Sequence, residues 1–201
     1  MNIHIKELDI YDFDKTMIPF DCGSLFCLYA MLHYPKAIRN IPRMFVSALK
    51  YLKHKNLTVM KSDIFCFIKD IPVEKTVKDF WDKYDKYIFD WAQKENRERY
   101  SVIISASPDF LIREIAKRIQ IDDYFCTRHD SAGKIIGNNC HDREKVRVFK
   151  EKYDGSDVIS VYSDSIENDK YIFSLGKNCF HTVNGKKIHF NYSDMYKNDK
   201  I

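Results

Sequence analysis

Short runs of β-branched and aromatic residues alternate with amphipathic segments along much of the chain. Three of these runs predict buried strands, over residues 8–13, 100–104 and 158–162. Two weaker runs predict strands over residues 124–127 and 179–183. Apolar positions three and four residues apart predict helices over 109–120 and 143–153. Strands that alternate with helices are typical of a parallel α/β sheet.

The pattern changes to helical throughout between Pro19 and about Asn96. Apolar residues recur there at three- and four-residue steps, as in Val73, Val77, Phe80, Trp81, Tyr84, Ile88 and Trp91. Prolines divide the region into four predicted helices, at about 22–34, 38–54, 58–69 and 73–93. We therefore expect two domains. Residues 1–18 and 97–201 form an α/β core domain, and residues 19–96 form a helical cap domain inserted into it.

Composition fits one core with an inserted lobe, because the chain has 201 residues and is 45% hydrophobic. The net charge is only +4, and the basic and acidic residues alternate, so nucleic-acid binding is not indicated. Charged residues precede any apolar stretch, and the longest such stretch, 22–34, is shorter than the ~20 residues that span a bilayer. We predict a cytoplasmic protein without a transmembrane helix. Its six cysteines form no CxxC pair and are expected to be free thiols.

The first strand runs into the sequence Asp12-Phe13-Asp14-Lys15-Thr16. Two carboxylates two residues apart would leave the carboxyl end of a buried strand together, where α/β folds bind ligands. A carboxylate can attack a phosphate dianion only if a divalent cation reduces their repulsion, which points to a metal such as Mg²⁺. The alternative is that this string merely ends a strand and caps a helix.

Two later segments offer groups that bind anions. The second strand ends in Ser105-Ala106-Ser107-Pro108, and we expect the proline to begin a helix whose free N–H groups face an anion. Lys145 lies just inside a predicted helix start, where a cation is unfavourable unless it meets an anion. The alternatives are an ordinary serine N-cap and a solvated lysine.

An acidic cluster follows the strand predicted at 158–162. Asp164 comes first, with Asp169 five residues later. A hard cation prefers such oxygen ligands. The alternative is an acidic turn that opens a helix and needs no metal.

Taken together, DFDKT, VIIS, a lysine at a helix start, and YSDS followed by a further acid resemble the haloacid dehalogenase-like superfamily over nearly the whole chain. The helical insertion lies where the phosphoserine phosphatase-like branch carries its cap. The resemblance implies a Rossmann-like parallel sheet with an inserted α-helical cap. Two positions depart from the family pattern. Asn168 stands where many relatives have the last acid, with Asp169 one residue later, and Ser163 replaces a common glycine.

The resemblance also implies residue roles. Asp12 would be the nucleophile, Asp14 the general acid and base, and Ser105 and Lys145 the groups that hold the phosphate. Mg²⁺ would be bound by oxygens of Asp12, Asp14, Asp164 and Asp169, with Asp14 contributing its backbone carbonyl. The implied reaction is hydrolysis of a phosphomonoester through an aspartyl-phosphate. Asp14 argues against a dehalogenase, which usually lacks this second acid.

The expected substrate contacts are Thr16, Asp21, Ser107, Arg39 and Arg43. Asp21 lies nine residues after Asp12, where phosphoserine phosphatases have an acid that meets the substrate amino group, although it would also cap the following helix.

Apolar residues with lysines and arginines alongside fill the first predicted helices of the insertion, and we interpret them as the core of the cap. The alternative is a basic amphipathic face that meets a membrane surface. A small soluble phosphomonoester is therefore the favoured substrate, and a lipid phosphate at a membrane surface is the second. A non-catalytic protein that binds Mg²⁺ or a phospho-ligand is the third interpretation.

Overall fold

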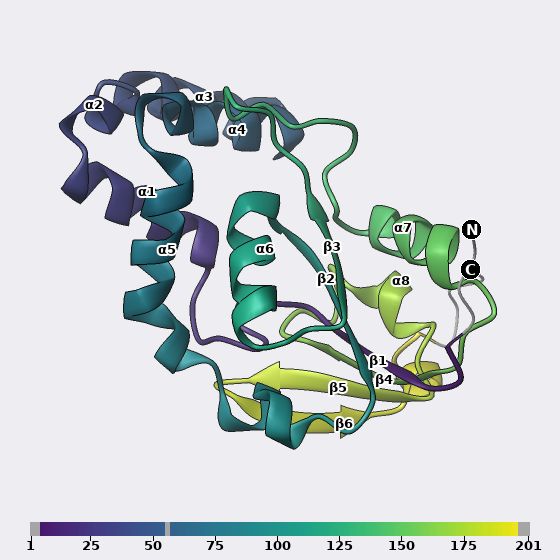
Figure 1. The fold of residues 1–201 in the computed structure, drawn as a ribbon. Helices are drawn as coiled ribbons and strands as arrows, with labels where there is room; N and C mark the ends of the chain where they lie inside the picture. The colour runs from purple at the N-terminus through teal and green to yellow at the C-terminus, as the bar shows by residue number, and fades with distance from the viewer. Residues whose placement is uncertain (1–4, 55–56, 197–201) are drawn as a thin grey trace.

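A six-stranded, mostly parallel sheet forms the centre of the molecule (Figure 1). The computed structural model describes residues 5–54 and 57–196. The strand order is β3-β2-β1-β4-β5-β6, and only β6 pairs antiparallel. The strands are β1 Leu8–Tyr11, β2 Tyr100–Pro108, β3 Asp123–Thr127, β4 Val158–Ser163, β5 Asn178–Val183 and β6 Lys186–Phe190.

Helices cover both faces of this sheet (Figure 1). On one face, Tyr11 and Ile103 belong to a core shared with helices α5 (Val73–Tyr84) and α6 (Asp109–Arg118). On the other face, Leu8, Ile10, Val102 and Ile104 pack with helices α7 (Arg143–Tyr153) and α8 (Lys170–Phe173). Because strand side chains alternate between faces, both faces are apolar, as expected for a parallel sheet covered on both sides.

Between β1 and β2, every regular element of the described residues is helical. These elements are α1 Cys22–His33, α2 Pro35–Ile38, α3 Ile41–His54, α4 Leu57–Ile64 and α5, followed or interrupted by 3₁₀ helices over Phe65–Asp70, Asp85–Tyr87, Asp90–Ala92 and Lys94–Asn96. The last predicted helix, 73–93, was too long. The chain leaves the helix after Tyr84 because the Phe89 backbone N–H donates to the Met17 carbonyl (3.0 Å) and Ile88 is buried.

Strand boundaries differ from the predictions at two motifs. β1 ends at Tyr11, whereas β2 continues to Pro108, which pairs with Thr127 of β3. The predicted helix follows this strand directly, with Pro108 as its N-cap and Asp109 as its first residue. β6 was not predicted at all. It follows a tight turn at Asn184 and Gly185, whose φ angles of 49° and 77° suit these two residue types.

The interpretation of the insertion's apolar residues as cap core is correct for Phe26, which is fully buried, but wrong for α3. Four apolar side chains of that helix are largely exposed: Phe45, Val46, Leu49 and Leu52. Across the described part of the chain, no helix is long and apolar enough to cross a membrane.

Candidate active site

A pocket of about 190 Å³ opens at the carboxyl ends of β1, β2 and β4. It brings together eight residues singled out from the sequence: Asp12, Asp14, Asp21, Ser105, Ser107, Lys145, Asp164 and Asp169. Lys15, Lys61, Ala106, His141, Ser165 and Asn168 complete the lining. Residues distant in the sequence thus meet where parallel α/β sheets usually bind ligands.

Asp12 and Asp14 face the pocket because the residue between them points the other way. Phe13 is fully buried and packs edge-on against Trp81, with ring centroids 5.9 Å apart. Directly after Asp14 the backbone turns sharply at Lys15, which has a φ of 55°. Few residues other than glycine adopt this left-handed conformation, so the bend that closes the motif has an energetic cost.

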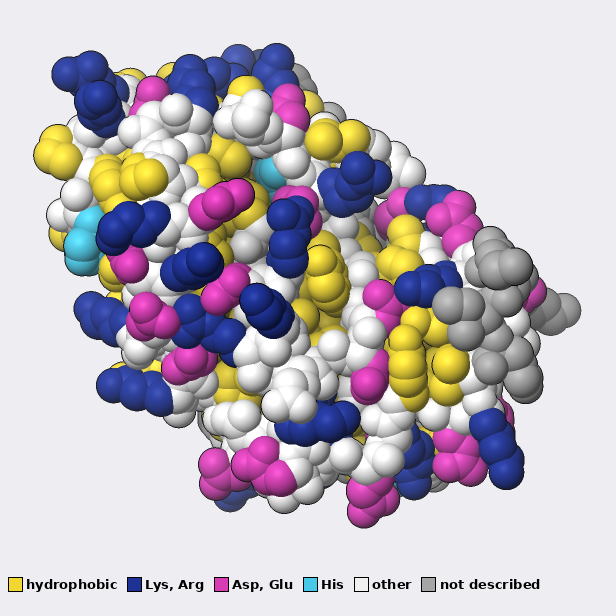
Figure 2. Space-filling model, viewed as in Figure 1, with side chains coloured by type: hydrophobic (Ala, Val, Ile, Leu, Met, Phe, Trp, Pro, Cys, Tyr) yellow, Lys and Arg dark blue, Asp and Glu magenta, His cyan; other side chains and the backbone are white. Residues whose placement is uncertain are grey.

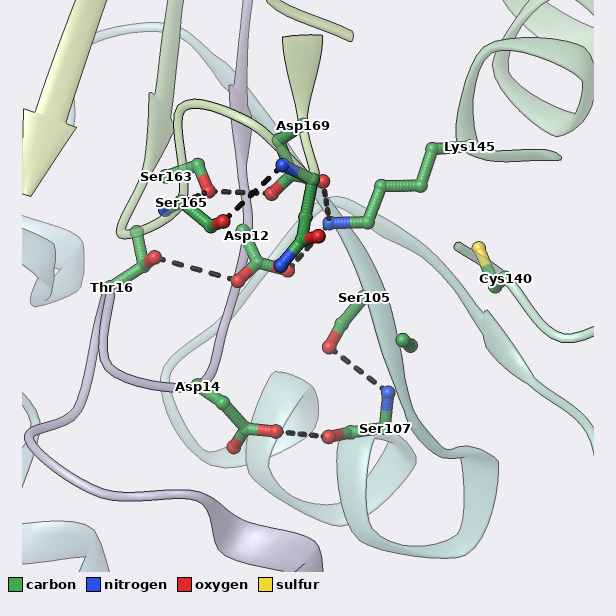
Figure 3. Close-up of polar contacts among 12 residues, drawn as sticks. Asp12, Asp14, Thr16, Ser105, Ser107, Cys140, Lys145, Ser163, Ser165 and Asp169 are labelled. Carbon is green, nitrogen blue, oxygen red and sulfur yellow. Dashed lines mark hydrogen bonds and ion pairs between the residues drawn. The ribbon is translucent and has the colours of Figure 1, made fainter. Parts of the chain in front are cut away.

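Lys145 joins two of the aspartates. Its Nζ lies 2.8 Å from Asp12 Oδ1 and 2.7 Å from Asp169 Oδ1 (Figure 3). The lysine is only 3% exposed, and the two carboxylates raise its pKa even though burial alone would lower it. These anions explain how a cation is tolerated in the first turn of α7.

Asp169, not Asn168, is the acid that meets Lys145. Its second oxygen accepts a hydrogen bond from Ser163 Oγ at 2.5 Å, so both carboxylate oxygens have partners. Asn168 is exposed at the pocket rim. Ser163, which replaces the common glycine, therefore has a definite function here as a donor to Asp169.

Both acids of the first motif have raised pKa values. Burial raises the pKa of Asp12 to about 7, opposed by Lys145 and reinforced by Asp169. Burial, together with nearby Asp21, raises the pKa of Asp14 to about 6. Asp14 accepts hydrogen bonds from the Cys22 backbone N–H (2.8 Å) and from Ser107 Oγ, and both bonds oppose that rise. Near neutral pH, these two acids can each exchange a proton.

Thr16 is buried beside the pocket and does not line it. Its Oγ1 accepts a hydrogen bond from the Asp164 backbone N–H (2.8 Å) and lies 3.5 Å from Asp12 Oδ2. His181 Nε2 lies 2.9 Å from the Asp164 carbonyl oxygen. Thr16 and His181 thus fix the loop that carries Asp164, whose pKa is raised by burial and by Asp169.

Ser105 and Asp21 both line the pocket and also make local contacts. Ser105 Oγ accepts a hydrogen bond from the Ser107 backbone N–H (3.2 Å). Asp21 caps α1 by accepting from the Ser24 backbone N–H (2.7 Å), and it lines the pocket as well. The two alternatives for Asp21, helix cap and pocket residue, are therefore compatible.

The two predicted arginines lie elsewhere. Arg39 is exposed at the end of α2, and Arg43 forms an ion pair with Asp63 (2.6 Å). Neither lines the pocket. The helical insertion contributes Lys61 instead, from α4. Its Nζ donates to the Ala106 carbonyl (2.8 Å) and to Asn139 Oδ1 (3.3 Å), and burial lowers its pKa.

Lys61, His141, Lys15 and Ser165 were not predicted as pocket residues. The sequence could have predicted Lys15 and Ser165, because each adjoins a predicted aspartate. Lys61 carried no such signal, since it is one of many lysines on predicted amphipathic helices.

A hairpin from the core reaches the helical insertion close to this pocket. His129 and Ile135 form an isolated antiparallel bridge, and the Ile135 backbone N–H donates to Ser62 Oγ (3.1 Å). At the hairpin tip Gly133 has a φ of +80°, and an added Cβ would lie 2.0 Å from the Phe65 carbonyl oxygen. Only glycine fits so close an approach.

The charge of the pocket suits a divalent cation. Five aspartates and three lysines line it among the described residues, so anionic groups outnumber cationic ones. No group of three or more His, Cys, Asp or Glu side chains within residues 5–54 and 57–196 is arranged to hold a metal by itself. Mg²⁺ needs only one or two protein carboxylates when water and substrate phosphate supply the rest. Asp12 and Asp164 both line the pocket and carry carboxylates of that kind.

Comparisons with known proteins agree with this architecture. A family model described as haloacid dehalogenase-like hydrolase matches residues 10–171. No curated protein sequence matches the chain significantly. Members of this family generally use Mg²⁺.

Among solved structures, a Bordetella pertussis protein of unknown function aligns with a TM-score of 0.60 and 15% identity, over 78% of this chain and 82% of that one. Phosphoserine phosphatase in apo form aligns with a TM-score of 0.59 and 16% identity, over 97% and 100% of the two chains. A phospho-aspartyl intermediate analogue of phosphoserine phosphatase aligns with a TM-score of 0.54 and 15% identity, over 89% of this chain and 87% of that one. These identities are low, so the likeness concerns the fold, and the predicted fold class is confirmed.

Proposed function

Because the chain belongs to the haloacid dehalogenase-like hydrolase family, we propose that it is a Mg²⁺-dependent phosphatase that acts on a small phosphomonoester through Asp12. The observation that carries the proposal is the contact of Lys145 with Asp12 inside a pocket that also holds Asp14. This arrangement combines a nucleophile, a cation for the phosphate and a proton-exchanging acid.

In the first step, an Asp12 carboxylate oxygen attacks phosphorus and the bond from phosphorus to the substrate oxygen breaks. Lys145 holds Asp12 Oδ1, so Oδ2, on the Thr16 side, is the attacking oxygen. Asp14 donates its proton to the leaving oxygen. With a pKa of about 6, Asp14 can be protonated for this purpose without losing its later function as a base.

In the second step, Asp14 takes a proton from water, and the resulting oxygen nucleophile attacks phosphorus. The bond from phosphorus to Asp12 breaks, which releases inorganic phosphate and restores both acids. Ser105 and Lys145 hold the phosphate oxygens through both steps. Hydrogen bonds from the Cys22 backbone N–H and Ser107 Oγ keep the Asp14 carboxylate in place between the two steps.

Asp12, Asp164 and the backbone carbonyl of Asp14 would hold the Mg²⁺. When bound, the ion supplies the positive charge that lets a carboxylate approach a phosphate dianion. Asp169 would act on this site through Lys145 and not as a direct ligand, because both of its oxygens are already engaged.

The pocket's size and polarity support a small, charged substrate. Its volume of about 190 Å³ leaves room for a phosphate and a compact organic group. Asp21 and Lys61 lie at the side formed by the helical insertion and offer one negative and one positive charge for that group. An amino-acid phosphate such as phosphoserine is therefore the first substrate to test.

The test is release of inorganic phosphate from p-nitrophenyl phosphate, phosphoserine and other phosphorylated metabolites, with Mg²⁺ or with excess chelator. We expect turnover that needs the metal, and an acid-stable phosphoprotein that Asp12→Asn cannot form. Asp154→Asn, which alters an exposed carboxylate, is the matched control and should behave as wild type. Turnover retained by Asp12→Asn would refute the mechanism, and phospho-ligand binding without any turnover would favour a sensor.

A further inference from the structure

Helix α3 turns its apolar side outward. Ile41, Phe45, Leu49 and Leu52 recur at three- and four-residue steps and are between 42% and 65% exposed. Ser47, on the opposite side of the helix, is buried. Helices of globular proteins normally bury the apolar stripe and expose the polar one, so the orientation of α3 is the reverse of the usual one.

Contacts with α4 fix this orientation. Asp63 of α4 accepts a hydrogen bond from Ser47 Oγ (2.8 Å) and forms an ion pair with Arg43 (2.6 Å). Both partners project from the side of α3 away from its exposed stripe. Rotating the stripe inward would break both contacts and leave Asp63 without them, so packing of α3 on its neighbours requires the apolar side to face out.

The surrounding sequence is strongly basic. No aspartate or glutamate occurs from Cys22 to Ser62, whereas seven lysines and arginines do: Lys36, Arg39, Arg43, Lys50, Lys53, Lys55 and Lys61. The chain as a whole carries only +4, so the rest of it is net negative. Figure 2 shows lysine and arginine side chains along the edge of the molecule formed by α2 and α3, with hydrophobic side chains between them.

We propose that the exposed stripe of α3 (Ile41, Phe45, Leu49 and Leu52), flanked by Lys53, docks on an anionic lipid bilayer. Apolar side chains of an amphipathic helix enter the boundary between headgroups and acyl chains, while lysines extend to the anionic headgroups. With 14 residues, α3 is about 21 Å long and suits a position in the plane of the surface.

Charge favours a membrane over a second copy of this chain. A symmetric dimer through the stripe would bring two basic surfaces together, and like charges across an interface are unfavourable. A bilayer with anionic headgroups is complementary to both properties of the surface, its apolar stripe and its positive charge. The proposal concerns this surface alone and does not depend on the catalytic mechanism.

Vesicle co-sedimentation tests it with the full chain. Wild-type protein should sediment with phosphatidylcholine vesicles that contain phosphatidylserine, and much less with phosphatidylcholine alone. Leu49→Gln/Leu52→Gln should abolish sedimentation. Lys53→Glu should weaken it at least about fivefold, because each positive charge near an anionic surface contributes roughly fivefold.

Matched controls alter the same residue types far from α3. Ile188→Gln on β6 and Lys94→Glu/Lys186→Glu change exposed side chains and should bind as wild type. Thermal unfolding of every variant establishes that the fold is intact. Absence of vesicle binding by wild type, or equal binding by the α3 variants, would overturn the proposal. So would a wild-type dimer in sedimentation velocity that Leu49→Gln/Leu52→Gln converts to monomer.

Discussion

Replacing the proposed nucleophile should make the metal-free protein more stable as it removes activity. In the folded state burial raises the pKa of Asp12 from 3.8 to about 7, so ionising this carboxylate costs free energy. The folded state binds this proton more tightly than the unfolded chain does. The protein therefore loses stability as the pH rises from 3.8 to about 7. Asp12→Asn removes the ionisation.

The size of the effect follows from the same values. Each pKa unit corresponds to about 1.4 kcal/mol, so the difference between 3.8 and about 7 gives at most about 4 kcal/mol above pH 8. Near pH 4 the expected gain in the free energy of unfolding is less than about 1 kcal/mol. Asparagine keeps an oxygen for Lys145 and offers an N–H toward Thr16, and Lys145 still has Asp169 at 2.7 Å. The bond that is lost is the long one (3.5 Å) that the Thr16 hydroxyl donates to Asp12 Oδ2.

Thermal unfolding with chelator at about pH 8 and about pH 4 measures this difference. A gain of up to about 4 kcal/mol raises the melting temperature by roughly 10 °C in a protein of this size at the higher pH. Asp109→Asn is the matched control with the opposite sign, because hydrogen bonds from His129 outweigh burial and lower the pKa of Asp109. A variant Asp12→Asn that melts at or below the wild-type temperature at about pH 8 would refute the electrostatic argument.

Three further outcomes follow from the pocket. In a pH–rate profile, hydrolysis of the phosphoenzyme should increase as the pH rises through about 6, where Asp14 becomes a base. Ser107→Ala should shift this increase to higher pH, because it removes a hydrogen bond that lowers the Asp14 pKa. An increase at an unchanged pH contradicts this. Asp164→Ala should raise the Mg²⁺ concentration for half-maximal activity by more than about tenfold, the usual effect of losing even an outer partner of a metal; an unchanged titration removes Asp164 from the site. Lys61→Met should raise KM more than it lowers kcat if this lysine binds the substrate's organic group, whereas a loss in kcat alone would assign it to the reaction itself.

The sequence predicted the sheet and its polar edge because these depend on local patterns. Buried parallel strands are short apolar runs, and the aspartates at their ends stand out against them. Asp12, Asp14 and Asp164 needed no knowledge of tertiary contacts. β6 could also have been predicted from the sequence, since Asn184-Gly185 is a strong signal for a β-hairpin. The search for strands by apolar runs alone did not use this signal.

Other features depended on contacts between distant residues. Nothing local distinguishes Lys61 from the unrelated lysines of the insertion, and only the tertiary fold brings its side chain to Ala106 of β2. The outward side of α3 had the same origin. A helical wheel defines an apolar side, but Asp63, well outside that helix, decides which way it points. The end of α5 at Tyr84 likewise depends on a hydrogen bond to Met17.

The contact between the Gly133 hairpin and the insertion has a kinetic consequence. The insertion is joined covalently to the core at its two ends and shares the apolar core of α5 and α6, and this hairpin adds a further contact at α4. Its polar part is a single hydrogen bond between Ile135 and Ser62, worth about 1 kcal/mol net. A single hydrogen bond of that size breaks and re-forms readily, so we expect this hairpin to detach from the insertion more often than the two covalent ends and the shared apolar core would allow the insertion to move.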